Sequence, residues 1–100
     1  MKKLLLATAA TALSVSMATA EDVKIGISMG FTGPLESMAP QMANGAELAI
    51  KEISESGKLM DGAKVEAVRA DNTCADAAAS VAAVERLVTS DKVNGIMGGM

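Results

Sequence analysis

The side chains that could perform chemistry in this sequence are two aspartates, Asp71 and Asp76, and two hydroxyls, Ser28 and Thr32. A nucleophilic hydroxyl needs a general base beside it, and histidine, the commonest such base, is absent from the chain. The aspartates flank the start of a predicted helix, where this residue type usually caps the helix or interacts with its dipole. The hydroxyls lie near a predicted turn, where they usually bond to nearby backbone. The sequence therefore predicts no catalytic residue and no enzyme.

A phosphate-binding loop and a metal site are the next possibilities. Residues 30–35 read Gly-Phe-Thr-Gly-Pro-Leu, which matches neither the dinucleotide fingerprint nor the P-loop. Pro34 also removes one backbone donor that a phosphate would use. Cys74 has no second ligand at metal-binding spacing. We therefore predict neither a cofactor nor a metal.

Residues 1–20 have the three parts of a cleavable secretory signal peptide. Lys2 and Lys3 precede a moderately apolar stretch, and residues 18–20 (Ala-Thr-Ala) place small residues at the positions that a signal peptidase reads. A permanent membrane anchor is the alternative, but the uncharged stretch is short for a span and rich in Ala, Thr and Ser. We predict cleavage after Ala20 and a soluble exported protein that begins at Glu21 without a membrane anchor.

The charge of the remaining chain argues against nucleic acid and anionic lipid as partners. The sequence has 9 basic and 12 acidic residues, and removal of Lys2 and Lys3 leaves 7 against 12, a net charge of −5. No cluster of lysine or arginine follows Lys3. An acidic domain of this kind has no electrostatic basis for binding a polyanion.

Three strands and two helices are predicted to alternate along residues 21–100. Strand periodicity covers residues 23–29, 63–70 and 93–97, and helices are predicted to begin between Ser37 and Ala39 and again after Thr73. Asn94-Gly95 could instead form a hairpin turn, but residues 90–92 are too few and too polar for a paired arm. The long crossovers favour parallel strands, and the charged second strand suits an edge. The predicted fold class is α/β, the β-α-β-α-β start of a doubly wound parallel sheet.

Cap residues and apolar rows define the two helices. Pro40 is tolerated only in a first turn, and Gly57 favours the end of the first helix. Thr73 and Asp76 fit a capping box, in which the threonine hydroxyl accepts from the backbone of residue 76 and the aspartate reaches back. The predicted inward faces are Met42, Ala46, Ala49, Ile50 and Ile53 in the first helix and Ala77, Val81, Val84 and Val88 in the second.

The methionines of residues 21–100 suggest both core and ligand contacts. Met29, Met42 and Met97 lie on apolar faces and are predicted to fill the core. Met38 and Met100 lie just beyond strand ends, where open α/β sheets bind ligands, although packing explains them equally well.

The mature stretch is too poor in core-forming residues to stand alone. It contains one aromatic residue, Phe31, and a single cysteine, Cys74. Small exported domains normally need complete disulfides or a metal, and a lone thiol in an oxidising compartment usually has its partner elsewhere. We therefore expect residues 21–100 to be the N-terminal part of a longer protein.

Several segments of this sequence, taken in order, resemble periplasmic substrate-binding proteins of the branched-chain amino acid (leucine/isoleucine/valine) group, which serve ATP-driven importers. The matching segments are residues 21–27 (Glu-Asp-Val-Lys-Ile-Gly-Ile), 32–34 (Thr-Gly-Pro), 44–50 (Asn-Gly-Ala-Glu-Leu-Ala-Ile), 70–74 (Ala-Asp-Asn-Thr-Cys) and 93–99 (Val-Asn-Gly-Ile-Met-Gly-Gly). The resemblance implies a two-lobed, hinged α/β protein of the type I periplasmic binding fold, and this chain would open the first lobe.

The same resemblance implies roles for individual residues. Met38, Gly99 and Met100 fall at positions that line the ligand pocket of the family. Cys74 falls where the family often has a disulfide to a cysteine just past the third strand, beyond Met100. Leucine-binding members often carry tyrosine at the Met38 position, so the ligand of this chain could be another small metabolite.

The function that follows is capture of a branched-chain amino acid or a related small molecule and its delivery to the membrane permease of an ABC importer. Two alternatives remain open from the sequence. An exported α/β enzyme would require a nucleophile and a base outside this stretch, since fold does not fix function. A ligand-sensing domain of a receptor would require a membrane span elsewhere.

Overall fold

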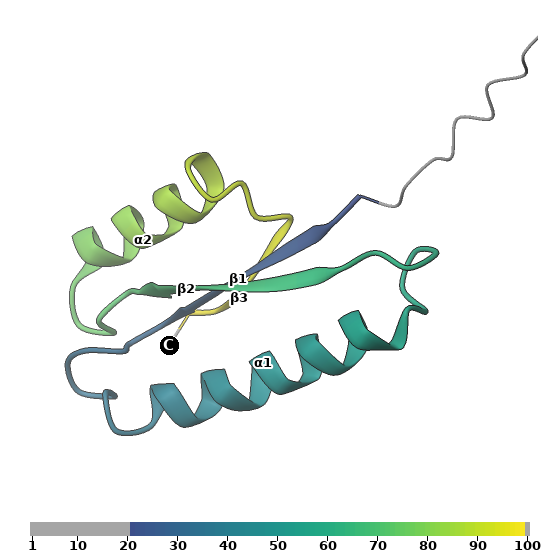
Figure 1. Cartoon of the computed structure of the whole chain (residues 1–100). Helices are drawn as coiled ribbons and strands as arrows, with labels where there is room; N and C mark the ends of the chain where they lie inside the picture. The colour runs from purple at the N-terminus through teal and green to yellow at the C-terminus, as the bar shows by residue number, and fades with distance from the viewer. Residues whose placement is uncertain (1–20, 100) are drawn as a thin grey trace, which may run out of the picture.

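A computed structural model describes residues 21–99, and the predicted order of elements is confirmed (Figure 1). The elements are β1 (Val23–Met29), α1 (Ala39–Ser56), β2 (Val65–Asp71), α2 (Ala77–Thr89) and β3 (Gly95–Gly98). The second and third strands begin two residues later than predicted. The predicted signal peptide, residues 1–20, and Met100 lie outside the described residues.

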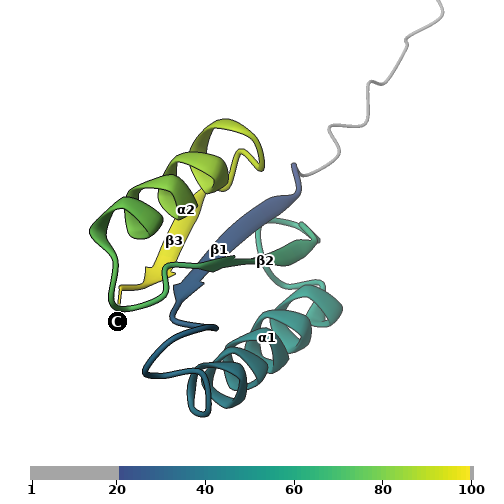
Figure 2. The ribbon, with the colours of Figure 1, turned by 90° about the vertical axis from the view of Figure 1, so that its left-hand side faces the viewer.

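The three strands form one parallel sheet, as predicted, and their order in it is β2-β1-β3. The register pairs Met29 with Asp71 at the carboxyl ends of β1 and β2, and Ser28 with Gly98 at those of β1 and β3. Figures 1 and 2 show α1 on one face of the sheet and α2 on the other. The chain therefore reverses its winding direction at β1, and the carboxyl ends of β1 and β3 border the switch point where such folds bind ligands.

The alternative hairpin at Asn94 is excluded by its pairing with β1. The Asn94 backbone N–H donates to the Lys24 carbonyl at 2.8 Å, and the Lys24 backbone N–H donates to Asn94 Oδ1 at 2.9 Å. Asn94 therefore aligns the start of β3 beside β1. The charged strand β2 lies at an edge of the described sheet, as predicted.

The helix α1 has the predicted ends but only part of the predicted inward face. Pro40 lies in its first turn, and Gly57 ends it in the left-handed conformation at φ 66°. Ala39 and Ala43 are buried against Ile27 and Met29, with Ala46 and Ile50 packed beside them. Met42 and Ile53 were wrongly placed in the core, since they are 42% and 48% exposed. Small alanine side chains let the helix approach the sheet through a row adjacent to the predicted one.

The predicted inward face of α2 was wrong. Ala83 and Leu87 are buried against Ala70, with Val68 and Val93 beside them. The predicted row of valines lies outside this contact, and Val81 is 57% exposed. The helix carries apolar residues on several sides, so periodicity alone did not identify the side that meets the sheet. Leu87 also fits against Gly26, where an added Cβ would lie 2.8 Å from Leu87 Cδ1.

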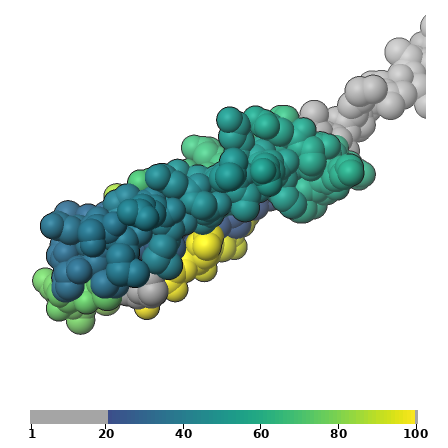
Figure 3. All heavy atoms as spheres, turned by 90° about the horizontal axis from the view of Figure 1, so that it is seen from below, coloured from purple at the N-terminus to yellow at the C-terminus, as the bar shows by residue number. Residues whose placement is uncertain are grey.

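The strand β3 is the least covered part of the described sheet. Met97, predicted to be core, is 39% exposed, and Ile96 is exposed to a similar degree. Figure 3 shows β3 beside α1 at the surface, because α1 lies over the other two strands. Within residues 21–99, no helix is long and apolar enough to cross a membrane.

Candidate functional site

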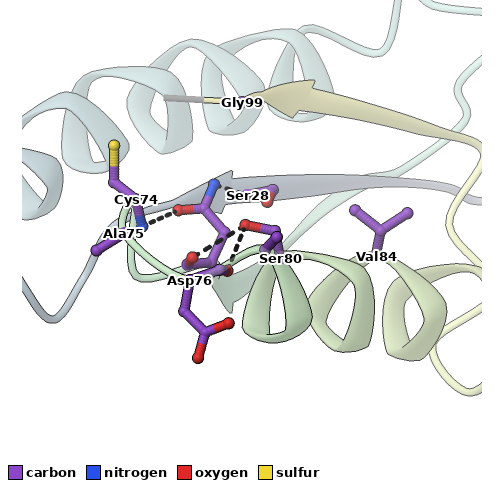
Figure 4. Close-up of a pocket in the computed structure, with 9 residues that line it drawn as sticks. Ser28, Cys74, Ala75, Asp76, Ser80, Val84 and Gly99 are labelled. Carbon is purple, nitrogen blue, oxygen red and sulfur yellow. Dashed lines mark hydrogen bonds between the residues drawn. The ribbon is translucent and has the colours of Figure 1, made fainter.

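A cleft of about 440 Å³ lies at the carboxyl ends of the strands, on the face covered by α2 (Figure 4). It is bounded by the end of β1, the turn after β2, the first turns of α2 and the residue after β3. The lining residues are Ser28, Asn72, Cys74, Ala75, Asp76, Ala77, Ser80, Val84 and Gly99. The cleft thus opens beside the switch point of the sheet.

The polar side chains at the base of the cleft bond to one another. Asn72 is buried, and its Nδ2 donates to Ser28 Oγ at 3.2 Å while its Oδ1 accepts from the Cys74 backbone N–H at 3.0 Å. Ser80 Oγ donates to the carbonyl oxygens of Asn72 and Asp76, each at 3.1 Å. Ser28 therefore has a satisfied hydroxyl, as predicted, although Asn72 rather than a turn satisfies it. The network contains no base that would activate a nucleophile.

Asp71 joins the loop after β1 to the turn after β2. Its Oδ1 accepts from the backbone N–H groups of Phe31, Thr32 and Thr73 at 3.0, 3.3 and 2.8 Å, and its Oδ2 accepts from Thr32 Oγ1 at 2.5 Å. The Thr32 hydroxyl and these backbone donors hold the pKa of Asp71 below its usual value. The prediction that Asp71 caps the second helix was wrong, because its carboxylate faces back toward β1.

Asp76 caps α2, as predicted, but not through a reciprocal capping box. The Asp76 backbone N–H donates to Thr73 Oγ1 at 3.2 Å, which confirms the threonine half of the prediction. The Asp76 carboxylate instead accepts from the backbone N–H groups of Ala78 and Ala79 at 2.8 and 3.3 Å. Asp76 is therefore the N-cap residue itself, three residues after Thr73, the predicted N-cap.

The turn that carries Cys74 has an uncommon backbone. Thr73 and Cys74 both have positive φ angles, 60° and 55°. Such angles are unfavourable for residues other than glycine and persist where surrounding bonds fix them. Cys74 is exposed, and Gly30 lies so close that an added Cβ there would be 2.9 Å from the Cys74 Cβ.

The residues predicted to contact a ligand are not all in this cleft. Gly99 lines it, and its backbone N–H donates to the Ser28 carbonyl at 3.0 Å. Met38 lies at the N-terminus of α1, is 55% exposed, and does not line the cleft. Met100 lies outside the described residues. The structure thus places Met38 and Gly99 after β1 and β3, the two strands at the switch point, without joining them in one cavity.

An ionic cluster that was not predicted from the sequence fastens α1 to β2. The Arg69 guanidinium bonds to both carboxylate oxygens of Glu47 and donates to Asn44 Oδ1 at 2.8 Å. It also lies 5.2 Å from the centre of the Phe31 ring. The bond from Arg69 lowers the pKa of Glu47, and the same bond raises the pKa of Arg69. The sequence offered one sign of this cluster, because the charged residue Arg69 falls on the same face of the predicted strand as the apolar Ala67.

No group of three or more His, Cys, Asp or Glu side chains within residues 21–99 is arranged to hold a metal ion. The cleft and its surroundings offer hydroxyl, amide and backbone groups for binding a small molecule. They do not offer an activated nucleophile.

Comparison with known proteins gives consistent matches. Residues 22–100 match the sequence profile of a family described as periplasmic binding protein. The chain is 34% identical, over 98% of its length, to the Leu/Ile/Val-binding protein homolog 7 of Brucella abortus (strain 2308). It is 35% identical, over 87% of its length, to the Leu/Ile/Val/Thr-binding protein of Salmonella typhimurium. It spans about a quarter of these curated relatives, 24% and 23% of their lengths.

A solved structure shares the fold. It is the branched-chain amino acid transporter substrate-binding protein LivJ from Streptococcus pneumoniae, in complex with isoleucine. The match has a TM-score of 0.68 and 32% sequence identity, and covers 78% of this chain and 22% of that one.

Proposed function

Since this chain belongs to the family of periplasmic binding proteins, we propose that it opens the first of two lobes that close on a branched-chain amino acid or a related small metabolite. The observation that carries the proposal is the shared fold and 32% identity with a binding protein whose structure contains isoleucine. The cleft at the switch point of the sheet supports it, because open α/β sheets bind ligands there. The protein works by binding and release, without catalysis.

Met38, Gly99 and Met100 contact the ligand in this proposal. Support comes from the position of Met38, which is the N-cap residue of α1 at the end of the loop that leaves β1. Its side chain is 55% exposed. Gly99 follows β3, the other strand at the switch point. A methionine at position 38 would give an apolar wall that adapts to the shape of the ligand side chain. The groups that bind the ligand ammonium and carboxylate belong to other parts of the complete protein.

Cys74 forms a disulfide with a cysteine that follows β3 in the complete protein. The support is positional, because Cys74 and Gly99 line the same cleft and the thiol is exposed there. A bridge at this point would connect the turn after β2 to the chain leaving β3. It would therefore fix two walls of the cleft relative to each other.

Delivery to the membrane permease of an ABC importer completes the function. Its support is the structural relative, which is the substrate-binding protein of a branched-chain amino acid transporter. The signal-peptide pattern of residues 1–20 supports export, with Glu21 as the first mature residue. Mass spectrometry of protein isolated from the periplasm would show that N-terminus, and a retained leader would contradict it.

The test of the function is a calorimetric and thermal-shift screen of the complete protein, translated from the whole reading frame that contains this chain. Bound ligand is first removed by partial unfolding and dialysis, and amino acids, amides and small organic acids are then added singly. A ligand at a hundred times its dissociation constant stabilises the folded state by about 2.7 kcal/mol. We expect such a shift with isoleucine, leucine or valine. No shift with any compound would contradict the proposal.

Two methionine variants make the test specific to the site. Met38→Ala removes the proposed ligand contact, whereas Met60→Ala removes a methionine that is 62% exposed in the turn between α1 and β2. We expect Met38→Ala to raise the dissociation constant for isoleucine by about tenfold. That factor corresponds roughly to the transfer free energy of two buried methylene groups. Met60→Ala is expected to leave binding unchanged.

A further inference from the structure

One carboxylate ties the loop between β1 and α1, residues 30–38, to the neighbouring strand. Phe31 and Thr32 donate three hydrogen bonds from this loop to Asp71. Within residues 21–99, no other hydrogen bond joins the loop to β2 or to the turn at residues 72–76. The loop ends at Met38, the N-cap residue of α1. Met38 therefore follows a segment whose described hydrogen bonds to the neighbouring strand and turn all end on Asp71, while the Phe31 ring packs against the core and lies 5.2 Å from the Arg69 guanidinium.

The strand pairing of the sheet does not continue into this loop. The pairing of β1 with β2 ends at Met29 and Asp71, so the hydrogen bonds from the loop to the Asp71 carboxylate begin where the strand ladder stops. Asp71 is the last residue of β2, and its backbone is fixed by the strand. The Asp71 carboxylate thus fixes the first residues of a loop that has no strand partner.

The same carboxylate also fixes the turn after β2. It accepts from the Thr73 backbone N–H at 2.8 Å, which supports a residue held at φ 60°. Gly33, at φ 89°, lies against that turn, and an added Cβ would be 2.7 Å from the Thr73 carbonyl oxygen. Loop and turn are therefore in direct contact, and Asp71 bonds to both of them.

Hydrogen bonds to an ionised carboxylate are stronger than those between neutral groups. Four donors converge on Asp71, and they lower its pKa, so the group is charged at neutral pH. Thr32 supplies two of these donors and is itself exposed, so the bonds form at the surface rather than inside the core. This arrangement is suited to setting the position of a loop more than to burying apolar area.

We propose that Asp71 is a positioning residue of the ligand pocket, which fixes the loop leading to Met38 and holds it against the Cys74 turn. The inference rests on the proposed function, because it assigns Asp71 a task in the same pocket. Asp71 does not touch the ligand. When the hydrogen bonds to Asp71 are weakened, the loop occupies its binding-competent position for a smaller fraction of the time. The apparent dissociation constant then equals the intrinsic one divided by that fraction.

Thr32 gives the gentlest test, because its side chain is exposed and small. Thr32→Val removes the hydroxyl that donates to Asp71 Oδ2 and preserves the shape of the side chain, whereas Thr32→Ser retains the hydroxyl. We expect Thr32→Val to raise the dissociation constant for isoleucine about threefold to tenfold, as for loss of one hydrogen bond to a charged group at a hydrated site. Thr32→Ser is expected to stay within about twofold of the unmodified protein, since it keeps that bond.

Asp71 gives a second pair of variants. Asp71→Ala removes all four acceptor contacts, and we expect a loss of affinity at least as large as that of Thr32→Val. Asp71→Asn retains one oxygen for the three backbone donors, and its amide can donate to Thr32 Oγ1, so binding should be largely restored. If Asp71→Ala does not fold, the Thr32 pair decides.

Ser54→Ala is the matched control for a purely structural bond. Ser54 Oγ accepts from the Val65 backbone N–H at 3.0 Å, which ties α1 to β2 at the opposite end of the sheet. This variant should lower the melting temperature by an amount similar to Thr32→Val and leave the dissociation constant unchanged. The control therefore distinguishes the two roles. Loss of a positioning bond changes the dissociation constant, whereas loss of a purely stabilising bond changes only the melting temperature.

The experiment is isothermal titration of the complete protein and its variants with isoleucine, or with the metabolite that the screen identifies. Weaker binding by Thr32→Val, with recovery in Thr32→Ser, supports the positioning role. Unchanged binding in Thr32→Val and Asp71→Ala overturns it while leaving the proposed function intact. Failure of the unmodified protein to bind any compound refutes the proposed function instead, so the two failures are distinguishable.

Discussion

Replacement of Gly98 by alanine tests the close approach of β1 and β3 at the switch point. Gly98 has a φ of 116°, and an added Cβ would lie 2.0 Å from the Ser28 carbonyl oxygen and 2.9 Å from the Ser28 carbonyl carbon. These neighbours are backbone atoms, which cannot rotate away as a side chain can. Gly98→Ala therefore requires the two strands to separate or β3 to change its backbone conformation.

The expected cost has two parts. A non-glycine residue held at this positive φ costs about 1–3 kcal/mol. Separation of the strands also breaks the hydrogen bond from the Gly99 backbone N–H to the Ser28 carbonyl, at 3.0 Å, which contributes about 1 kcal/mol. We expect the free energy of unfolding of the complete, ligand-free protein to fall by about 2–4 kcal/mol, the sum of these two costs.

Gly95→Ala is the control, since Gly95 lies on the same strand without a positive φ. An added Cβ there would make an ordinary contact at 3.8 Å with Ile25 Cδ1. Alanine in a strand is favoured over glycine by about 0.5–1 kcal/mol, so this variant should be neutral or slightly stabilising. Urea unfolding followed by circular dichroism measures both. Equal midpoints and slopes for the two variants would refute the close approach of Gly98 to Ser28.

Three other predictions concern Cys74, Asp71 and Leu87. Native protein isolated from the periplasm should incorporate a thiol-alkylating reagent at Cys74 only after reduction, and labelling without reductant would contradict the disulfide. The pKa of Asp71 is lowered in the folded state, so its contribution to stability is complete above the ordinary aspartate value, about 3.9, and is lost as pH falls through the lowered value. In melting experiments from neutral to acid pH, the stability difference between the unmodified protein and Asp71→Asn should therefore shrink as pH falls, and a constant difference would contradict this. Leu87→Ala should cost about 2–5 kcal/mol in urea unfolding, because Leu87 is fully buried; a loss below about 1 kcal/mol would show that Leu87 does not face the sheet.

The order of elements could be predicted because each has a strong local signal. β1 alternates over seven residues, and α1 is bounded by Pro40 and Gly57, whose backbone preferences act locally. Parallel pairing followed from the length of the crossovers. These features depend on neighbours in the sequence, so one chain was sufficient to find them.

The inward faces of the helices could not be predicted as well. On α2, alanines and valines occupy several sides, and two apolar rows compete for the sheet. The row with Ala83 and Leu87 makes the contact because Gly26 leaves room for Leu87 on β1. That fit depends on a residue 61 positions away in the chain, which periodicity within the helix does not include.

The role of Asp71 was hidden for the same reason. Near the start of a helix, an aspartate is most simply explained as a cap, and Asp76 does serve as one. Asp71 instead accepts from Phe31, 40 residues earlier. The resemblance to a family indicated that Asp71 lies in a matching segment, but only the register of β1 and β2 brings its carboxylate to the loop.

The order of the strands in the sheet also determines when each strand can pair as the chain emerges N-terminus first. β1 appears early, yet it lies between two partners that arrive later: its residues pair with β2 residues 42 positions further along the chain and with β3 residues 70 positions further along. Until β3 has arrived, one edge of β1 keeps its backbone groups unpaired, and such an edge can recruit strands of other chains. Holding this segment unfolded until about a hundred residues have emerged would therefore improve the yield of folded protein, because non-local strand pairing is intrinsically slow.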